Sequence, residues 1–362
     1  MAGTFSLNSN LTVPEIFRQK EIPSLTGLRA LAIILVVLSH IPYAPNCPFF
    51  IQLCYKYLIL GSTGVQLFFI ISGFLITGLL LKEQAEKGSV NFRNFYQRRA
   101  IRILPAYFSY LAIILILKSV QIAKANNNDV LAAASFLSNV FNVGKSWLVA
   151  HSWTVSAEMQ FYLLWPLAFV FLPSKYVYLF AVVIIYDLLY LQLRGIPYLF
   201  VFNYFFMPAF PIIFGAMLSV ALYKNWLTGI HNILMHPVFG WTIVLAMIMY
   251  LPRVYGPLRY VKVSYDGILQ ELLLTLFLYY AVHSSATSFI YRILNNRIAV
   301  YIGLMSYSIY LWQQIFFAPL YNYSVYPVWT VFPLNVILAL ATASLSYNFI
   351  EKPFLRLKAK LK

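Results

Sequence analysis

The chain has 362 residues, of which 61% are hydrophobic and only 10% are charged. A soluble domain usually carries about 25% charged residues, so this composition argues against a water-soluble protein and is typical of one embedded in a bilayer. The net charge of +16 is explained by basic residues that flank membrane helices, and we expect no nucleic-acid binding.

Apolar segments of membrane-spanning length recur along the whole chain. They fall at about 24–42, 58–81, 103–123, 148–172, 176–193, 199–222, 233–251, 266–284, 298–318 and 328–350. We therefore expect an all-α membrane protein, a bundle of about ten transmembrane helices forming one domain over residues 1–362. Short cytoplasmic tails would lie at about 1–20 and 353–362. The first span lacks a small-residue cleavage site after it, so we expect an uncleaved anchor.

The orientation follows from the distribution of Lys and Arg. If the N-terminus is cytoplasmic, 18 of the 26 Lys and Arg residues lie inside and 8 lie outside. This bias predicts that both termini are on the cytoplasmic side. The longest polar interruptions are a loop near 82–99, expected inside, and an Asn-rich stretch near 124–146, expected outside. Cys47 and Cys54 follow the first span and could form a bridge or remain free thiols.

The first span, IPSLTGLRALAIILVVLSHIP, carries Arg29 near its start and His40 near its end. They are eleven residues apart, about three helical turns, so the two side chains share a face about 16 Å apart along the axis. Ionisable groups in a membrane helix are costly and usually face a polar interior. We expect the rest of the bundle to enclose that interior.

The second span, GSTGVQLFFIISGFLITGLL, is rich in small residues, including Ser72 and Gly73. Small residues let helix backbones approach closely in lipid, which is the simpler interpretation. The functional alternative is that Ser72 and Gly73 leave room for a ligand.

Three arginines, Arg98, Arg99 and Arg102, open the third span just before Pro105. Arg99 and Arg102 are three residues apart and share a helix face. Guanidinium groups bind phosphate in bidentate fashion, so the cluster could bind one or several phosphates. The alternative is that these residues only set the topology and attract anionic lipid.

The fourth span opens HSWTVSAEMQFYLLWPL, which places His151 and Glu158 seven residues apart on one face. Mainly apolar and aromatic residues follow Glu158, so we expect it inside the bundle, where its carboxylate needs a cationic or hydrogen-bonding partner or must be protonated. His40, His151 or an arginine could supply it. His151 could instead lie at the outer interface. Near the C-terminus, the tyrosines and tryptophan of SYSIYLW and the Glu351 region are expected to be structural.

Six stretches, taken together, resemble the acyltransferase-3 family of membrane O-acyltransferases. They occur in the family's order over nearly the whole chain: PSLTGLRALAIILVVLSH, GVQLFFIISGFLIT, FYQRRAIRILPAYF, HSWTVSAEMQFYLLWPL, SYSIYLW and IEKPF. The resemblance implies a ten-helix bundle that transfers an acyl group, usually acetyl, from cytoplasmic acyl-CoA to a hydroxyl on an envelope glycan or small molecule.

The resemblance also implies roles for individual residues. Arg29 and His40 match the family's first-helix pair, Arg99 and Arg102 its arginine pair, and Trp153 and Glu158 its fourth-span motif. Two positions depart from the pattern: Thr26 stands where an Asp is frequent, and Gln313 where a His usually follows YLW. Some relatives carry a soluble hydrolase-like domain, and no stretch of this sequence resembles one. We therefore expect this bundle to act alone or to hand its acyl group to a separate protein.

The residues predict a mechanism that fits this resemblance. Acetyl-CoA phosphates would bind Arg99 and Arg102, with Arg98 and Arg29 nearby, and the thioester would extend inward towards His40. The imidazole would act as general base for the acceptor hydroxyl or would itself be acylated. Glu158 would orient His40 or the acceptor, with support from Ser72, Gly73, Trp153 and His151. No metal is expected.

We expect the protein in a bacterial inner membrane, with an O-antigen or another envelope polysaccharide as the first candidate acceptor. Peptidoglycan, a glycolipid and a small molecule are alternatives. Two other functions stay open at this point. One is a transporter of a lipid-linked sugar or an anion without covalent chemistry. The other is a non-catalytic membrane scaffold that keeps the fold.

Overall fold

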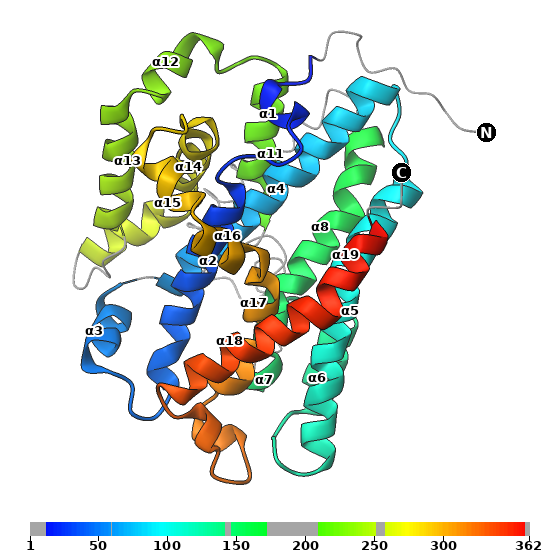
Figure 1. Cartoon of the computed structure of the whole chain (residues 1–362), viewed down its shortest axis with the longest axis vertical. Coiled ribbons are helices and arrows are strands. Elements are labelled where there is room, and N and C mark those ends of the chain that lie inside the picture. The colour runs from blue at the N-terminus through cyan, green and yellow to red at the C-terminus, as the bar shows by residue number, and fades with distance from the viewer. Residues whose placement is uncertain (1–11, 59, 142–145, 172–208, 251–257, 359–362) are drawn as a thin grey trace. The chain divides into compact units, whose positions relative to one another are not determined.

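The computed structural model describes residues 12–58, 60–141, 146–171, 209–250 and 258–358, and these are helical apart from turns and one isolated bridge between Ala123 and Tyr323 (Figure 1). The α-helices are α1 (Glu15–Arg18), α2 (Leu25–His40), α3 (Phe49–Tyr57), α4 (Leu60–Lys87), α5 (Phe92–Ser119), α6 (Asn127–Ala134), α7 (Trp147–Ala150), α8 (Ser152–Phe171), α11 (Ala209–Tyr223), α12 (His231–Leu234), α13 (Pro237–Tyr250), α14 (Leu258–His283), α15 (Phe289–Leu294), α16 (Arg297–Leu304), α17 (Ser306–Phe316), α18 (Leu334–Ser346) and α19 (Lys352–Lys358). Short 3-10 turns and one π-helical turn, η6 (Tyr347–Glu351), join them.

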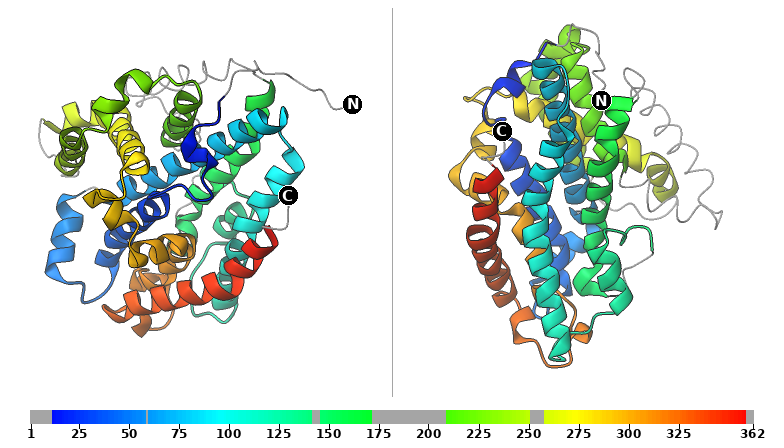
Figure 2. Two further views of the ribbon diagram at one scale, coloured as in Figure 1. Left: turned by 45° about the horizontal axis from the view of Figure 1, so that its top comes forward. Right: turned by 90° about the vertical axis from the view of Figure 1, so that its right-hand side faces the viewer.

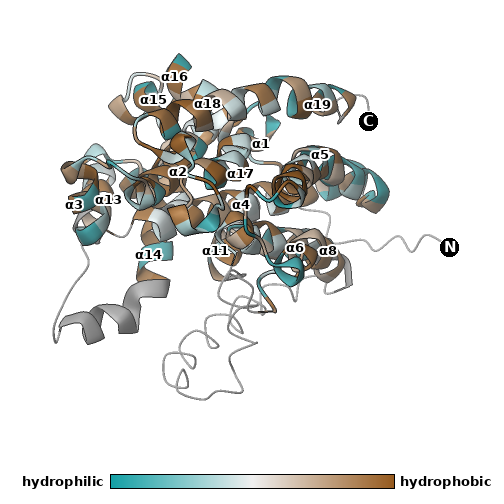
Figure 3. Cartoon of the chain, turned by 90° about the horizontal axis from the view of Figure 1, so that it is seen from below, coloured by the Kyte–Doolittle hydropathy of each residue, from teal (hydrophilic) through white to brown (hydrophobic). Residues whose placement is uncertain are grey.

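Within this described part, four helical segments are long and apolar enough to cross a membrane, and a bent pair, Phe210–Tyr223 with Thr228–Leu234, would make a fifth. The four are Leu25–Tyr43, Leu60–Lys87, Phe92–Ser119 and Leu334–Leu357. Figure 3 shows α5 changing from hydrophilic to hydrophobic colouring along its length, as its arginine-rich start predicts. The all-α class and the multi-pass character are therefore confirmed.

The number of spans and the cytoplasmic location of both termini stay predictions. The predicted span at 176–193 and most of the one at 199–222 lie outside the described residues. Other predicted spans are divided. The segment 148–172 is broken at His151 between α7 and α8, and 298–318 is broken at Met305 between α16 and α17.

The predicted polar loop near 82–99 is wrong, because α4 continues to Lys87 and α5 already begins at Phe92. Two pairs four residues apart support the last turns of α4, since Lys82 lies 3.8 Å from Glu86 and Lys87 lies 3.8 Å from Glu83. Such pairs stabilise a helix modestly. The side chain of Asn91 then caps α5 by accepting a hydrogen bond from the backbone N–H of Asn94. Local helix-forming interactions thus outweigh the polarity of the segment.

The chain forms two compact units that alternate along the sequence. Unit 1 comprises Met1–Ala32, Val65–Val90 and Leu164–Gly303, and unit 2 comprises Ile33–Gly64, Asn91–Leu163 and Leu304–Lys362. The expectation of one domain over residues 1–362 stays a prediction.

Unit 1 depends on glycines at which helix backbones meet. A Cβ atom on Gly73 of α4 would lie 1.8 Å from the carbonyl oxygen of Ile212 in α11, and one on Gly215 of α11 would lie 1.9 Å from the carbonyl oxygen of Ile70 in α4. These reciprocal contacts leave no space for a side chain, as in other closely packed membrane helices. The packing interpretation of Gly73 is therefore supported.

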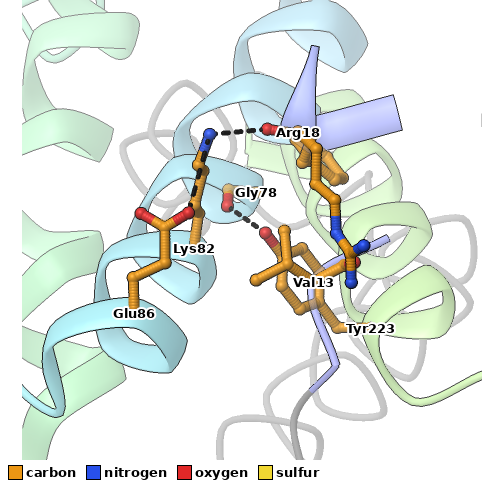
Figure 4. A network of polar contacts seen from close by, with 7 residues as sticks. Val13, Arg18, Gly78, Lys82, Glu86 and Tyr223 are labelled. Atoms are coloured by element: carbon orange, nitrogen blue, oxygen red, sulfur yellow. Dashed lines mark hydrogen bonds and ion pairs between the residues drawn. The ribbon is translucent and has the colours of Figure 1, made fainter. Parts of the chain in front are cut away.

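The segment before the first span is fixed to unit 1 by the contacts in Figure 4. Lys82 Nζ donates a hydrogen bond to the Phe17 carbonyl at 2.7 Å, and the Phe17 ring packs against Phe74 and Tyr223 with centroids 5.2 and 5.3 Å away. The Tyr223 hydroxyl donates to the Gly78 carbonyl at 3.1 Å. Two helices therefore hold α1 by both polar and aromatic contacts.

Unit 2 contains α17 packed along α18, and α5 packed beside η6 and α19. Figure 2 shows α18 and α19, coloured orange to red, running next to the cyan α5. Glu351 in η6 is buried and accepts a hydrogen bond from the Ser308 hydroxyl of α17. This pairing of a buried carboxylate fixes the C-terminal helices to α17.

Both cysteines are free in the structure. Cys47 is buried and its S–H faces the Pro48 carbonyl, and burial raises the pKa of its thiol. Cys54 is half-buried on α3.

The close contact at Gly73 predicts that Gly73→Ala destabilises the protein, because the added methyl group must push the α4 and α11 backbones apart. Overpacking of this kind costs about 1–3 kcal/mol, so the melting temperature in detergent should fall by several degrees. Gly229→Ala is the matched control, since nothing lies within 4 Å of a Cβ at that position. Equal melting temperatures for the two variants would contradict the packing account.

Candidate active site

His40 is the last residue of α2, and a 3-10 turn that contains Pro42 follows it. Its imidazole meets the indole of Trp147 edge to face, with ring centroids 5.6 Å apart. The side chain of Gln313 on α17, which is fully buried, lies close enough to the imidazole to interact with it. Among the described residues, the buried His40 Nδ1 atom and the two buried amide atoms of Gln313 have no partner in good hydrogen-bond geometry. The departure from the family pattern at position 313 therefore lies directly beside His40.

A second imidazole, His151, lies at the break between α7 and α8 and is 5% exposed. Tyr110 packs against it edge to face at 5.2 Å, and Tyr310 packs against it at 5.4 Å. Both ring nitrogens are buried without a hydrogen-bond partner in the described part of the chain. His151 is also close enough to interact electrostatically with His40. Aromatic rings from α5 and α17 therefore cover His151, and its possible position at the outer membrane interface stays a prediction.

A polar stripe on α8 faces α17. His151, Thr154, Glu158 and Tyr162 recur every three or four residues and so share one side of the helix. The Tyr310 hydroxyl of α17 lies 2.7 Å from Thr154 Oγ1 and donates to the His151 carbonyl at 3.2 Å. We call the stripe from His151 to Tyr162, together with its contacts to Tyr310, the polar seam. Its two ends are eleven positions apart in the sequence, about 16 Å along the helix axis.

Glu158 has the hydrogen-bonding partner that its apolar surroundings required, and that partner is Tyr162. The Tyr162 hydroxyl donates to a carboxylate oxygen of Glu158 one turn earlier on α8. Glu158 also lies within electrostatic range of Arg99 and of Tyr310. The carboxylate therefore joins the far end of the polar seam to the arginine cluster.

Arg99 is buried within α5, with 8% of its surface exposed. Its guanidinium carbon lies 5.6 Å from the ring centroids of both Phe95 and Tyr162, which is cation–π geometry. Its Nε atom is buried and has no hydrogen-bond partner within the described ranges. Arg98 and Arg102 are half-buried and within electrostatic range of Arg99. A buried guanidinium with an unused donor suits an anionic ligand such as a phosphate.

Of the other predicted residues, Arg29, Ser72 and Gly73 belong to unit 1, where Arg29 and Ser72 are half-buried and Gly73 packs against Ile212. Trp153 belongs to unit 2 and is 38% exposed.

Several residues at the site were missed or underrated by sequence reasoning. Tyr162 could have been found by its spacing of four from Glu158, whereas Trp147 gave no signal. Tyr310 was interpreted as structural, yet its hydroxyl joins the two helices of the polar seam. Among the described residues, no group of three or more His, Cys, Asp or Glu side chains could hold a metal ion.

Leaving a buried polar group without a partner costs about 1–3 kcal/mol. Unit 2 gathers several such groups at the ends of the polar seam: His40 Nδ1, the Gln313 amide, both His151 nitrogens and Arg99 Nε. Buried polar groups without partners can mark a site whose ligand supplies the missing hydrogen bonds. The imidazoles offer proton acceptors, and the guanidinium offers an anion-binding group.

Comparison with known proteins agrees with the family resemblance that the sequence motifs indicate. A family described as an acyltransferase domain matches residues 22–348. A Staphylococcus aureus (strain COL) protein named as a candidate O-acetyltransferase is 28% identical over 93% of this chain and 58% of its own length. The peptidoglycan O-acetyltransferase OatA of Listeria monocytogenes is 26% identical over 93% and 56%. Bacillus subtilis YrhL, named as a candidate peptidoglycan O-acetyltransferase, is 26% identical over 92% and 55%.

The chain thus spans a little over half the length of these curated relatives. No solved structure matches it. Because this family match covers most of the sequence, the chain belongs to the acyltransferase-3 family.

Proposed function

We propose that the chain transfers an acetyl group from acetyl-CoA to a hydroxyl group of an envelope glycan, in the cytoplasmic membrane of a bacterium. The observation that carries this proposal is the polar seam, with the unpartnered imidazole of His40 beside one end and the buried guanidinium of Arg99 beside the other. A family match to acyltransferases gives the reaction type.

His40 serves as the general base. Its Nδ1 atom is buried and unpartnered, so it is available to take the proton from an acceptor hydroxyl as that oxygen attacks the thioester carbonyl. The new ester bond forms, the carbon–sulfur bond breaks, and the CoA thiolate leaves and is protonated. An imidazole has an ordinary pKa near neutrality, which suits this proton transfer.

Arg99 and Arg102 bind the phosphate groups of CoA. The buried Nε of Arg99 fits an anionic oxygen, because a buried donor that lacks a partner gains most from one. His151 and Tyr162 are the two ends of the polar seam, about 16 Å apart along the helix axis. His151 interacts electrostatically with His40, and the Tyr162 ring lies against Arg99. A donor whose thioester lies at the end of a long, flexible arm suits this separation, and CoA has such an arm.

Glu158 holds Tyr162 against the guanidinium. The carboxylate accepts the Tyr162 hydroxyl hydrogen bond, and the same ring lies 5.6 Å from Arg99. We infer that Glu158 positions the arginine site rather than the imidazole. This role differs from the one expected from the sequence, in which Glu158 orients His40 or the acceptor.

The acceptor class rests on the relatives. Two of them are named for O-acetylation of peptidoglycan, so we propose an amino-sugar hydroxyl of peptidoglycan or its precursor as the acceptor. The earlier candidate, O-antigen, has no support from these names and stays a prediction. This chain spans a little over half the length of the relatives, and delivery of the acetyl group through a further protein stays a prediction too.

A transporter without covalent chemistry is separated from the enzyme by one measurement. Purified protein in membrane vesicles, given acetyl-CoA and a peptidoglycan disaccharide, should release free CoA and form the acetylated sugar. A transporter releases none.

His40→Ala should lower acetyl transfer by at least about 100-fold, because general-base catalysis contributes roughly that much or more. The readout is the rate of CoA release in vesicles containing the full chain. His236→Ala is the matched control, since His236 is exposed in the turn before α13. Retention of a large fraction of the rate by folded His40→Ala protein would refute the base assignment.

Arg99→Lys should raise the KM for acetyl-CoA by about 10-fold or more while changing the KM for the sugar little. Lysine keeps the charge but loses both the planar fork and the stacking on Phe95 and Tyr162. Arg93→Lys is the control, because Arg93 is exposed in the first turn of the same helix. An unchanged KM for acetyl-CoA would remove Arg99 from the donor site.

A further inference from the structure

The structure assigns a binding subsite for a sugar ring of the acceptor to the aromatic group formed by Tyr43, Tyr55 and Trp147, next to His40. This inference rests on the proposed function, because it names the acceptor side of the same site. All four residues belong to unit 2.

The aromatic rings form a continuous series that ends at His40. The Tyr43 ring lies 4.7 Å from the Trp147 ring and 5.5 Å from the Tyr55 ring, and Trp147 lies 5.6 Å from His40. The hydroxyls of Tyr43 and Tyr55 are hydrogen-bonded at 2.5 Å. Tyr43 is 40% exposed, whereas His40 Nδ1 is buried, so the series leads from an exposed ring to the buried base.

The polar atoms beside these rings match sugar hydroxyls. Trp147 Nε1 can only donate, the Gln313 amide can donate and accept, and neutral His40 Nδ1 can accept. All of these atoms are buried without a hydrogen-bond partner in the described residues. Aromatic faces combined with a few fixed polar groups are the usual means of holding a small polar ring.

A membrane-interface role for Trp147 does not explain this geometry. Interfacial tryptophans turn their N–H towards water or lipid headgroups, whereas Trp147 Nε1 is buried. The backbone of Trp147 is also fixed independently of its ring, since Gln314 Nε2 donates to its carbonyl at 2.8 Å. The indole is therefore held with its N–H directed inside the protein.

The test measures sugar binding without acetyl-CoA, so that it needs no catalysis. The probe is the disaccharide of N-acetylglucosamine and N-acetylmuramic acid, and the full chain is held in nanodiscs. Saturation-transfer NMR should show transfer to the C–H protons of the sugar rings in the unaltered protein. Tyr43→Leu and Trp147→Leu should weaken binding about 10-fold or more, because each removes a stacking face.

A conservative variant separates subsite loss from misfolding. Trp147→Phe keeps an aromatic ring but removes the N–H, so it should bind the disaccharide about five-fold more weakly, as expected for one lost hydrogen bond. In the transfer assay the KM for the disaccharide should rise in all three variants while the KM for acetyl-CoA stays unchanged. Tyr321→Leu and Trp226→Leu are controls, since both side chains are more than half exposed and lie elsewhere.

The outcomes are distinct. Absence of saturation transfer to the disaccharide in the unaltered protein, or normal binding by the three variants, overturns the subsite. Binding that depends on Tyr43 and Trp147 in a protein that transfers no acetyl group supports the subsite and refutes the proposed function instead.

Discussion

The hydroxyl of Tyr310 occupies the position on which the site depends. It contacts Thr154 Oγ1 and donates to the His151 carbonyl. It thereby joins α17 to the start of α8, at the break between α7 and α8. In a bilayer no water is available to satisfy a free carbonyl, and the protein must provide the partner. This requirement fixes the register of α17 against α8, and thereby places His151 and Glu158 along a single line of polar contacts.

The polar groups of unit 2 fall into two kinds. Glu158 is satisfied by Tyr162, and Glu351 by Ser308. These pairs remove the cost of a buried carboxylate and stabilise the helix arrangement. His40 Nδ1 and Arg99 Nε are equally buried but have no hydrogen-bond partner in the described chain. Under the proposed function, a ligand would supply the partners of these two atoms, whereas the paired carboxylates support the structure.

This division also bears on the role of Gln313, which belongs to the buried groups without a hydrogen-bond partner among the described residues. The family pattern usually has a histidine at this position, and the glutamine here is fully buried beside His40. An amide cannot take up a proton near neutral pH, but it can hydrogen-bond both the imidazole and a sugar hydroxyl. With glutamine at position 313, His40 and His151 are the imidazoles of unit 2, and under the proposed function proton transfer would fall to one of them.

The sequence by itself determined the membrane character, the helical class and the family, and it led to His40, Arg99 and Glu158 as the proposed site residues. Hydrophobic segment length, charge placement and i, i+4 spacing are local properties, and they can be read without coordinates. Sequence could not show that Trp147 and Gln313 flank His40, nor that Tyr162 lies against Arg99, because contacts between helices depend on which faces pack together. The breaks at His151 and Met305 were not predicted either, since both fall within segments of membrane-spanning length. Only the tertiary structure decided these points. Because little water is available inside a bilayer, a polar group needs a partner within the protein, and helix packing determines which groups come close enough to pair.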